Sequence, residues 1–273
     1  VPNNVIRTII IVFAIIAFIS CKTNIANNSK DLKKNNLDYI PYYLKVYEAD
    51  SLYLINDFEK SYEILDSLFK VYKPLNIDNY VEYGVYLNSA VMSGHNEDIK
   101  SKVEYGYRHF GGITTFHKKY SEMRDEINKA ANLSKQEIKK LKLEYYNNLN
   151  LDLRKKMLEM YNEDQSVRIE NKSHTDMDLI DEKNRAKLNE IFKTYGFPKK
   201  ELIGSNNAYD MPDDGTINLN IFFMHQPDSV RAKYLPIFLN AVKNGLCEPD
   251  VYATLFDRDL ILKGENQYYG TYF

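Results

Sequence analysis

Residues 56–74 read NDFEKSYEILDSLFKVYKP and carry the clearest folding signal in the chain. Large apolar side chains recur in this stretch at steps of three and four residues: Phe58, Tyr62, Leu65 and Phe69. That spacing places them on one face of a helix. Pro74 cannot continue a helix, and the Asn56-Asp57 pair marks the preceding turn. The stretch therefore predicts a turn followed by an amphipathic helix.

The same helical pattern occurs on both sides of this stretch. A helical run begins after Pro41, and a second pair of helices is separated by a break at Gly94-His95-Asn96 and closed by Gly111-Gly112. These breaks divide residues 41–110 into helical hairpins that resemble degenerate tetratricopeptide repeats. Their spacing departs from the repeat's period of about 34 residues, so a plain helical bundle explains the pattern equally well. We expect the C-terminal part to fold without these hairpins.

The C-terminal part contains further helix signals. Ser134 and Glu137 form a capping-box pair at the start of a long helical pattern. Asparagine is a poor helix former, so three asparagines are expected to interrupt that pattern: Asn147, Asn148 and Asn150. We expect a loop at 170–178, and partial alternation at 217–223 permits a short strand. Further helices are predicted at 179–195, 229–244 and 249–262.

These signals predict a mainly α-helical chain with at most a short strand or two. The expected segments are a lipoprotein signal peptide (1–20), a lipidated Cys21 with a flexible tether (21–37), a helical-hairpin region (38–117) and a C-terminal helical domain (118–273).

The first residues predict where the protein resides. Arg7 precedes an uncharged apolar run at 8–20, which is too short to span a bilayer but long enough for the core of an export signal. Cys21 directly after Ser20 resembles the lipidation site of bacterial lipoproteins. We therefore expect a cell-envelope protein that is attached to the membrane through lipid on Cys21. Lys22 favours the outer membrane, facing the periplasm.

Composition and motifs limit the classes of partner and cofactor that we expect for this protein. A formal net charge of −2 gives no long-range attraction for nucleic acid. No metal-ligand spacing, phosphate-binding glycine loop or GxSxG motif occurs, so we expect neither a metal nor another cofactor. A buried hydrophobic role for Cys247 is favoured over a reactive one. A protein partner is expected to bind residues 41–110.

Two polar residues occupy positions where apolar side chains are expected. Asn184 lies four residues from both Ile180 and Leu188, and Arg258 interrupts the apolar stripe of the last predicted helix. A buried amide needs hydrogen-bond partners, and a buried guanidinium needs a carboxylate. The candidate carboxylates are Asp164, Asp181 and Asp257. We expect Asp164 or Asp181 to hold Arg258, with Asn184 and His225 close to that pair.

Surface ion pairs are the alternative explanation. Asp164 and Arg168 are four residues apart, as are Asp181 and Arg185, so each couple can pair on an exposed helix face. We favour that account for Arg185. Both accounts remain open for three residues: Asp164, Asn184 and Arg258. His225 ends an apolar run, where a hydrogen-bonded structural histidine is favoured over a catalytic base.

Several short motifs lie in residues 158–273: Asp164-Gln165-x-x-Arg168, Asp181-x-x-Asn184, Tyr195-Gly196-Phe197-Pro198, Ile203-Gly204, His225, Leu235-Pro236, Ala241-Val242, Asp257-Arg258 and Gln267-x-Tyr269-Gly270-Thr271. Together they resemble an uncharacterised bacterial family, the domain of unknown function numbered 6624. The resemblance implies no established activity. It does imply one polar centre made of Asp164, Arg168, Asn184, His225, Asp257, Arg258, Gln267 and Tyr269.

The chain departs from that family's pattern at several positions. Phe197 stands where the family usually has Trp, Gln226-Pro227 interrupts the usual His-Ala-Asp, and Tyr272 replaces a usual Gln. The chain begins with Val1 and ends just after Gly270-Thr271, where relatives continue, as expected of a fragment.

A binding function is preferred on these grounds, with a protein partner at the hairpins or a small polar ligand at the polar centre. The alternative is a hydrolase-type enzyme in which His225 acts as general base and Asp257 or Asp164 orients it. Arg258 would then stabilise a developing anion. No nucleophile is identifiable for that reaction. A third alternative is a purely structural envelope lipoprotein.

Overall fold

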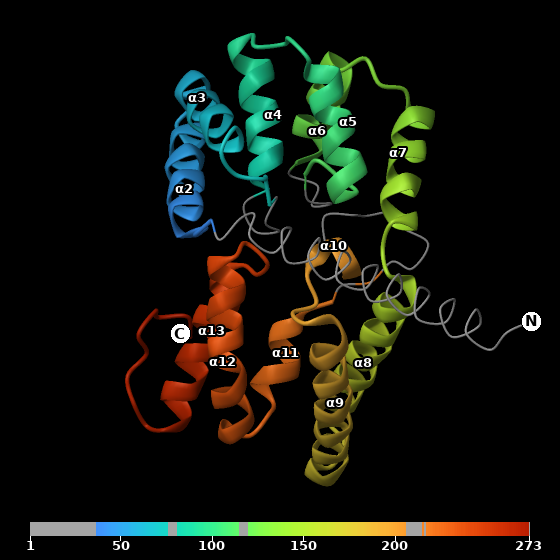
Figure 1. Cartoon of the computed structure of the whole chain (residues 1–273), viewed down its shortest axis with the longest axis vertical. Coiled ribbons are helices and arrows are strands. Elements are labelled where there is room, and N and C mark those ends of the chain that lie inside the picture. The colour runs from blue at the N-terminus through green and yellow to red at the C-terminus, as the bar shows by residue number, and fades with distance from the viewer. Residues whose placement is uncertain (1–36, 76–80, 115–119, 206–214, 216, 273) are drawn as a thin grey trace, which may run out of the picture. The chain divides into compact units, whose positions relative to one another are not determined.

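The computed structural model describes residues 37–75, 81–114, 120–205, 215 and 217–272, and these residues form a mainly α-helical fold without strands (Figure 1). The helices are α2 (Ile40–Leu54), α3 (Phe58–Phe69), α4 (Glu82–Ser93), α5 (Ile99–Phe110), α6 (Ser121–Ala130), α7 (Lys135–Asn147), α8 (Leu151–Ile169), α9 (His174–Tyr195), α10 (Lys200–Ile203), α11 (Leu219–Met224), α12 (Asp228–Lys243) and α13 (Pro249–Leu262). The predicted fold class is confirmed.

Helix ends follow the local signals in the sequence. The Asp57 side chain accepts a hydrogen bond from the Lys60 amide at the start of α3. The predicted capping box at Ser134 and Glu137 is present at the start of α7. The asparagine-rich break separates α7 from α8, because the Asn150 side chain caps the new helix. These ends are set by residues that lie next to them in the chain.

The structure differs from the local sequence patterns at two places. Residues 219–224 form helix α11 where the alternation permitted a short strand, and α9 begins at His174 within the expected loop. Adjacent residues of a strand point to opposite faces, whereas Phe222 and Phe223 are both buried. A helix surrounded by α9, α12 and α13 can bury both. At α9, the Ser173 side chain caps the helix earlier than the apolar pattern indicates.

The hairpin helices share one apolar core with the C-terminal helices. Residues Asp38–Phe273 form one compact unit, and buried apolar contacts continue from Tyr42 to Leu255. The Tyr43 hydroxyl lies 2.9 Å from the Val242 carbonyl oxygen and 3.1 Å from that of Cys247. The expected boundary at 117–118 lies outside the described residues, and the described residues on both sides of it share this core.

The predicted signal peptide, Cys21 and most of the tether lie outside the described residues. Within the described part of the chain, every helix is too short or too polar to cross a bilayer.

Truncation tests the shared core. We expect a chain that begins at residue 118 to lose cooperative melting, because removing α2 exposes the apolar surface around Val242 and Cys247.

In the full chain, Tyr43→Phe should lower the free energy of unfolding by about 0.5–1.5 kcal/mol through loss of one buried hydrogen bond. Thermal melts followed by circular dichroism measure both effects. A cooperative melt of the truncated chain would show that the two regions fold separately.

Candidate functional site

Helices α8 and α9 form an antiparallel pair that builds the candidate site (Figure 1). Ion pairs between them fix their register: Lys156–Glu190, Glu163–Lys183 and Arg168–Asp181. In this register Asp164 lies opposite the turn of α9 that carries Asp181 and Asn184. Asp181 and Asn184 are three residues apart, so they share a helix face.

Arg168 joins two carboxylates across the helix pair. Its Nη2 atom lies 2.7 and 2.9 Å from the two oxygens of Asp181. Its Nη1 atom lies 3.1 Å from Asp164 Oδ1. The predicted Asp164–Arg168 pair therefore forms, but in a buried setting, because the Asp164 side chain is 1% exposed. Asp181 pairs with Arg168 and not with Arg185.

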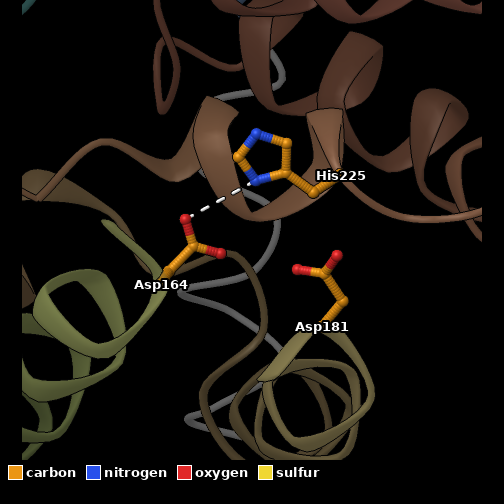
Figure 2. Close-up of side chains that lie close together, drawn as sticks. All are labelled: Asp164, Asp181 and His225. Carbon is orange, nitrogen blue, oxygen red and sulfur yellow. Dashed lines mark ion pairs between the residues drawn. The ribbon is translucent and has the colours of Figure 1, made fainter. Parts of the chain in front are cut away.

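His225 completes this group from the end of α11. Figure 2 shows its ring facing Asp164, with Asp181 on the neighbouring helix. The Nδ1 atom lies 3.5 Å from Asp164 Oδ2. We call Asp164, Arg168, Asp181, Asn184 and His225 the polar centre. Ion-pair distances bring Asp164, Arg168, Asp181 and His225 together, and Asn184 is assigned to the centre because it lies one turn after Asp181 on α9.

The polar centre carries an excess of negative charge when His225 is neutral, because two carboxylates face one guanidinium. Burial raises the pKa of Asp181, and Asp164 adds to that effect, whereas Arg168 and His225 oppose it. The Asp181 carboxylate is therefore costly to ionise without a nearby cation. The centre is suited to hold one more positively charged or hydrogen-donating group.

Several polar atoms of the centre lack a hydrogen-bond partner among the described residues. Asn184 is fully buried, and neither its Oδ1 nor its Nδ2 atom has such a partner. The same holds for Asp164 Oδ1 and His225 Nδ1. A buried polar atom without a partner costs about 1–3 kcal/mol. A water molecule or another bound group that supplied these partners would remove this cost.

Three residues of the centre have the donor chemistry of a metal site. One atom each of Asp164, Asp181 and His225 lie within 4.8 Å of one another. No metal spacing is visible in the sequence because these residues come from α8, α9 and the end of α11. The only local signal is Asp181-x-x-Asn184, which places two oxygen donors on one helix face.

Gln226 is a positioning residue that the sequence reasoning missed. Its Nε2 atom donates to the Asp181 carbonyl oxygen at 3.0 Å, and its Oε1 atom accepts from Arg185 Nε at 2.9 Å. Its own carbonyl oxygen accepts from Arg231. These bonds attach the end of α11 to α9 and so hold the neighbouring His225 beside Asp164. The sequence contained one signal for this residue, because Gln226-Pro227 departs from the His-Ala-Asp that is usual in the resembled family.

Asp257 belongs to a different place and does not orient His225. Its fully buried carboxylate accepts hydrogen bonds of 2.8–2.9 Å from the Tyr268, Tyr269 and Thr271 amides and from the Thr271 hydroxyl. Burial works to raise the pKa of Asp257, but these hydrogen bonds outweigh it and lower the pKa below 3.8. Asp257 therefore anchors the C-terminal segment to α13.

Arg258, Gln267 and Tyr269 also lie away from the polar centre. Among the described residues Arg258 forms no ion pair with Asp164 or Asp181, and both of these carboxylates pair with Arg168 instead. Gln267 instead bonds the Tyr272 backbone through both of its side-chain polar atoms. The Tyr269 ring packs against Tyr252 and Phe256. The eight residues that the resemblance groups into one centre therefore do not lie at one place. The predicted ion pair of Arg258 with Asp164 or Asp181 is wrong.

A cavity of about 70 Å³ lies outside the polar centre, between the hairpin helices and the C-terminal helices. Cys247, His109 and Tyr145 contribute to its lining. Burial raises the pKa of Cys247 well above its usual value, so the thiol stays protonated. This agrees with the expected role of Cys247 as a small buried hydrophobic residue.

Comparisons with protein-family models, curated proteins and solved structures give no match for this chain. The resemblance of residues 158–273 to the domain of unknown function remains a prediction. The functional argument therefore depends on the polar centre itself.

Removing the Asp257 carboxylate should release the C-terminal segment and leave the polar centre intact. We expect Asp257→Asn to speed amide hydrogen exchange at Tyr268, Tyr269 and Thr271, because the amide group accepts fewer hydrogen bonds than a carboxylate. The imidazole NMR signals of His225 should not shift. Altered His225 signals with unchanged exchange would instead place Asp257 at the polar centre.

The lowered pKa of Asp257 also predicts acid release of this segment. A carboxyl group with a folded-state pKa below 3.8 contributes stability that is present above pH 3.8. That contribution is lost as the pH falls through the lowered folded-state value. Amide exchange at Thr271 should therefore accelerate in acid in the wild type. In Asp257→Asn the exchange, corrected for its intrinsic pH dependence, should show no such step.

Proposed function

We propose that this chain is a lipid-anchored envelope protein that binds a small polar ligand at the polar centre. The single observation behind the ligand site is Asn184, a fully buried amide whose two polar atoms have no hydrogen-bond partner among the described residues. It shares a helix face with Asp181 and lies opposite Asp164. A ligand that contacts Asn184 and Asp164 would satisfy atoms that the surrounding side chains leave unsatisfied.

The contrast with neighbouring residues supports a binding role over a purely structural one. A structural network usually satisfies its own buried members. Gln226 does so, since its side chain bonds both the Asp181 backbone and Arg185. Asn184 lies one residue from Arg185 on α9, yet it takes no part in these bonds. The arrangement thus favours an external partner for Asn184.

The envelope location and the hairpin surface are further parts of the proposal. The apolar run after Arg7 and the Ser20-Cys21 junction support export and lipid attachment, and Lys22 supports the outer membrane facing the periplasm. Helices α2 to α5 pack as successive neighbours, as tetratricopeptide-like hairpins would. They are the proposed surface for a protein partner.

An enzymatic role is the alternative that one observation favours. His225 Nδ1 lies 3.5 Å from Asp164 Oδ2, so Asp164 can orient the imidazole as a general base. Asp257 and Arg258 have no part in this version, because Asp257 holds the C-terminal segment. A reaction would require turnover that is lost in His225→Gln, whereas a binding protein shows only an altered affinity.

Asn184→Leu tests the ligand site. Leucine matches the branching of asparagine and removes the unsatisfied polar atoms, so the melting temperature of the unliganded protein should rise. Wild-type protein should also be stabilised by at least one compound in a thermal-shift panel of metal salts, amino acids, sugars and nucleotides, and the variant should not respond to it.

Asn189→Leu on the same helix is the matched control for this test. The Asn189 amide oxygen accepts hydrogen bonds from Tyr234 and Lys233, so its loss should lower the melting temperature. If Asn184→Leu lowers the melting temperature as Asn189→Leu does, Asn184 is a structural residue and the ligand site is refuted.

Lipid attachment is tested separately. Expressed in a bacterium, the full chain should partition into detergent and carry the mass of a diacylglycerol-linked cysteine. Cys21→Ser should abolish that mass and release or misprocess the protein, because serine lacks the thiol that accepts the lipid. Unchanged mass and membrane association in Cys21→Ser would disprove the anchor.

A further inference from the structure

The donor atoms at the polar centre match the requirements of a divalent cation. Carboxylate oxygens and an imidazole nitrogen bind such ions at about 2.0–2.2 Å. The donor atoms of Asp164, Asp181 and His225 already lie within 4.8 Å of one another, so small side-chain rotations bring them around one ion. Figure 2 shows the three side chains converging from separate elements.

Asn184 is the independent observation that points to a ligand at this cluster. Its Oδ1 atom is a neutral oxygen donor, fully buried and without a hydrogen-bond partner among the described residues. Because it is three residues from Asp181 on α9, both side chains project from one helix face toward α8. Paired donors at such spacing on facing helices are how helix bundles build internal metal sites.

Arg168 does not exclude a cation from this place. A carboxylate has about four lone-pair sites, and Arg168 uses only some of those on Asp164 and Asp181. Asp164 Oδ1 lies 3.1 Å from Arg168 but lacks a well-aligned hydrogen bond. Arg168 also fixes the two carboxylates side by side. Its positive charge should weaken cation binding, so removing that charge should increase the affinity for a cation.

We infer that the polar centre binds one divalent transition-metal ion, with Asp164, Asp181 and His225 as ligands and the Asn184 amide oxygen as a fourth. This inference rests on the proposed ligand site. A mixed set of carboxylate, amide and imidazole donors suits Mn²⁺, Fe²⁺ and Zn²⁺, whereas Mg²⁺ and Ca²⁺ favour oxygen donors alone.

The test measures binding of Mn²⁺ and Zn²⁺ to the untagged full chain, purified in detergent and stripped with EDTA. We expect one ion per chain by isothermal titration calorimetry, and a melting temperature that rises with metal concentration. Bound Mn²⁺ should show nitrogen coupling in pulsed electron paramagnetic resonance. His225→Gln should remove that coupling and weaken binding at least tenfold, as should Asp164→Asn.

A matched control lies on the same helix. His174 is an exposed residue in the first turn of α9, away from the polar centre, so His174→Gln should leave affinity within twofold of the wild type. If Asp164→Asn does not fold, His225→Gln decides the result, because the His225 side chain is partly exposed.

Arg168→Met separates a cation from other ligands. Removing one positive charge should tighten Mn²⁺ binding at least tenfold, and metal should restore the melting temperature that the stranded carboxylates lower. A hydrogen-bonded or anionic ligand predicts weaker binding in the same variant. Asn184→Asp, which adds a carboxylate, should likewise tighten Mn²⁺ binding.

The outcomes distinguish this inference from the proposed function. Absence of Mn²⁺ and Zn²⁺ binding at 1:1 stoichiometry, or equal binding in His225→Gln and His174→Gln, overturns the metal site. The ligand site survives that result if a metal-free compound stabilises the wild type but not Asn184→Leu. If no compound or metal does so, both proposals fail together.

Discussion

The contact between Arg168 and two buried carboxylates is the interaction on which the site depends. Asp164 lies on the same helix as Arg168, and Asp181 lies on the next, so one guanidinium connects both helices. Buried carboxylates need such a partner because desolvation disfavours their charged form. The contact helps to fix the register of α8 against α9. That register in turn places Asn184 opposite Asp164 and makes the amide a member of the centre.

The short helix α11 then brings the remaining donor to this pair. Phe223 packs against Phe192 of α9 and against Tyr234 and Phe238 of α12, and Gln226 bonds α9 directly. His225 lies between these two anchors, so apolar packing and a hydrogen-bond network together set the imidazole position. Both side-chain polar atoms of Gln226 form hydrogen bonds, whereas neither of those of Asn184 does among the described residues. This difference between adjacent parts of one structure separates supporting residues from the proposed binding residues.

The C-terminal segment has its own structural requirement. The Asp257 carboxylate accepts hydrogen bonds from backbone amides of residues that follow α13, and the Gln267 side chain accepts one from the Tyr272 amide. Polar residues that a family resemblance groups together can therefore serve two tasks, one at the polar centre and one in closing the chain end against α13. At the other end of the described chain, Tyr43 reaches the turn after α12. The apolar core consequently extends through both halves of the chain.

The sequence by itself determined the features that depend on near neighbours. The amphipathic helix at 58–69, the helix at 249–262, the Ser134–Glu137 capping box and the asparagine break before α8 are examples, since helix propensity and capping act within a few residues. Tertiary structure decided that residues 219–224 form a helix, because their two phenylalanines are buried among several helices. It also decided that Arg168, and not Arg258, meets Asp181. Pairing between distant side chains depends on helix packing and register, which no local pattern in the sequence encodes.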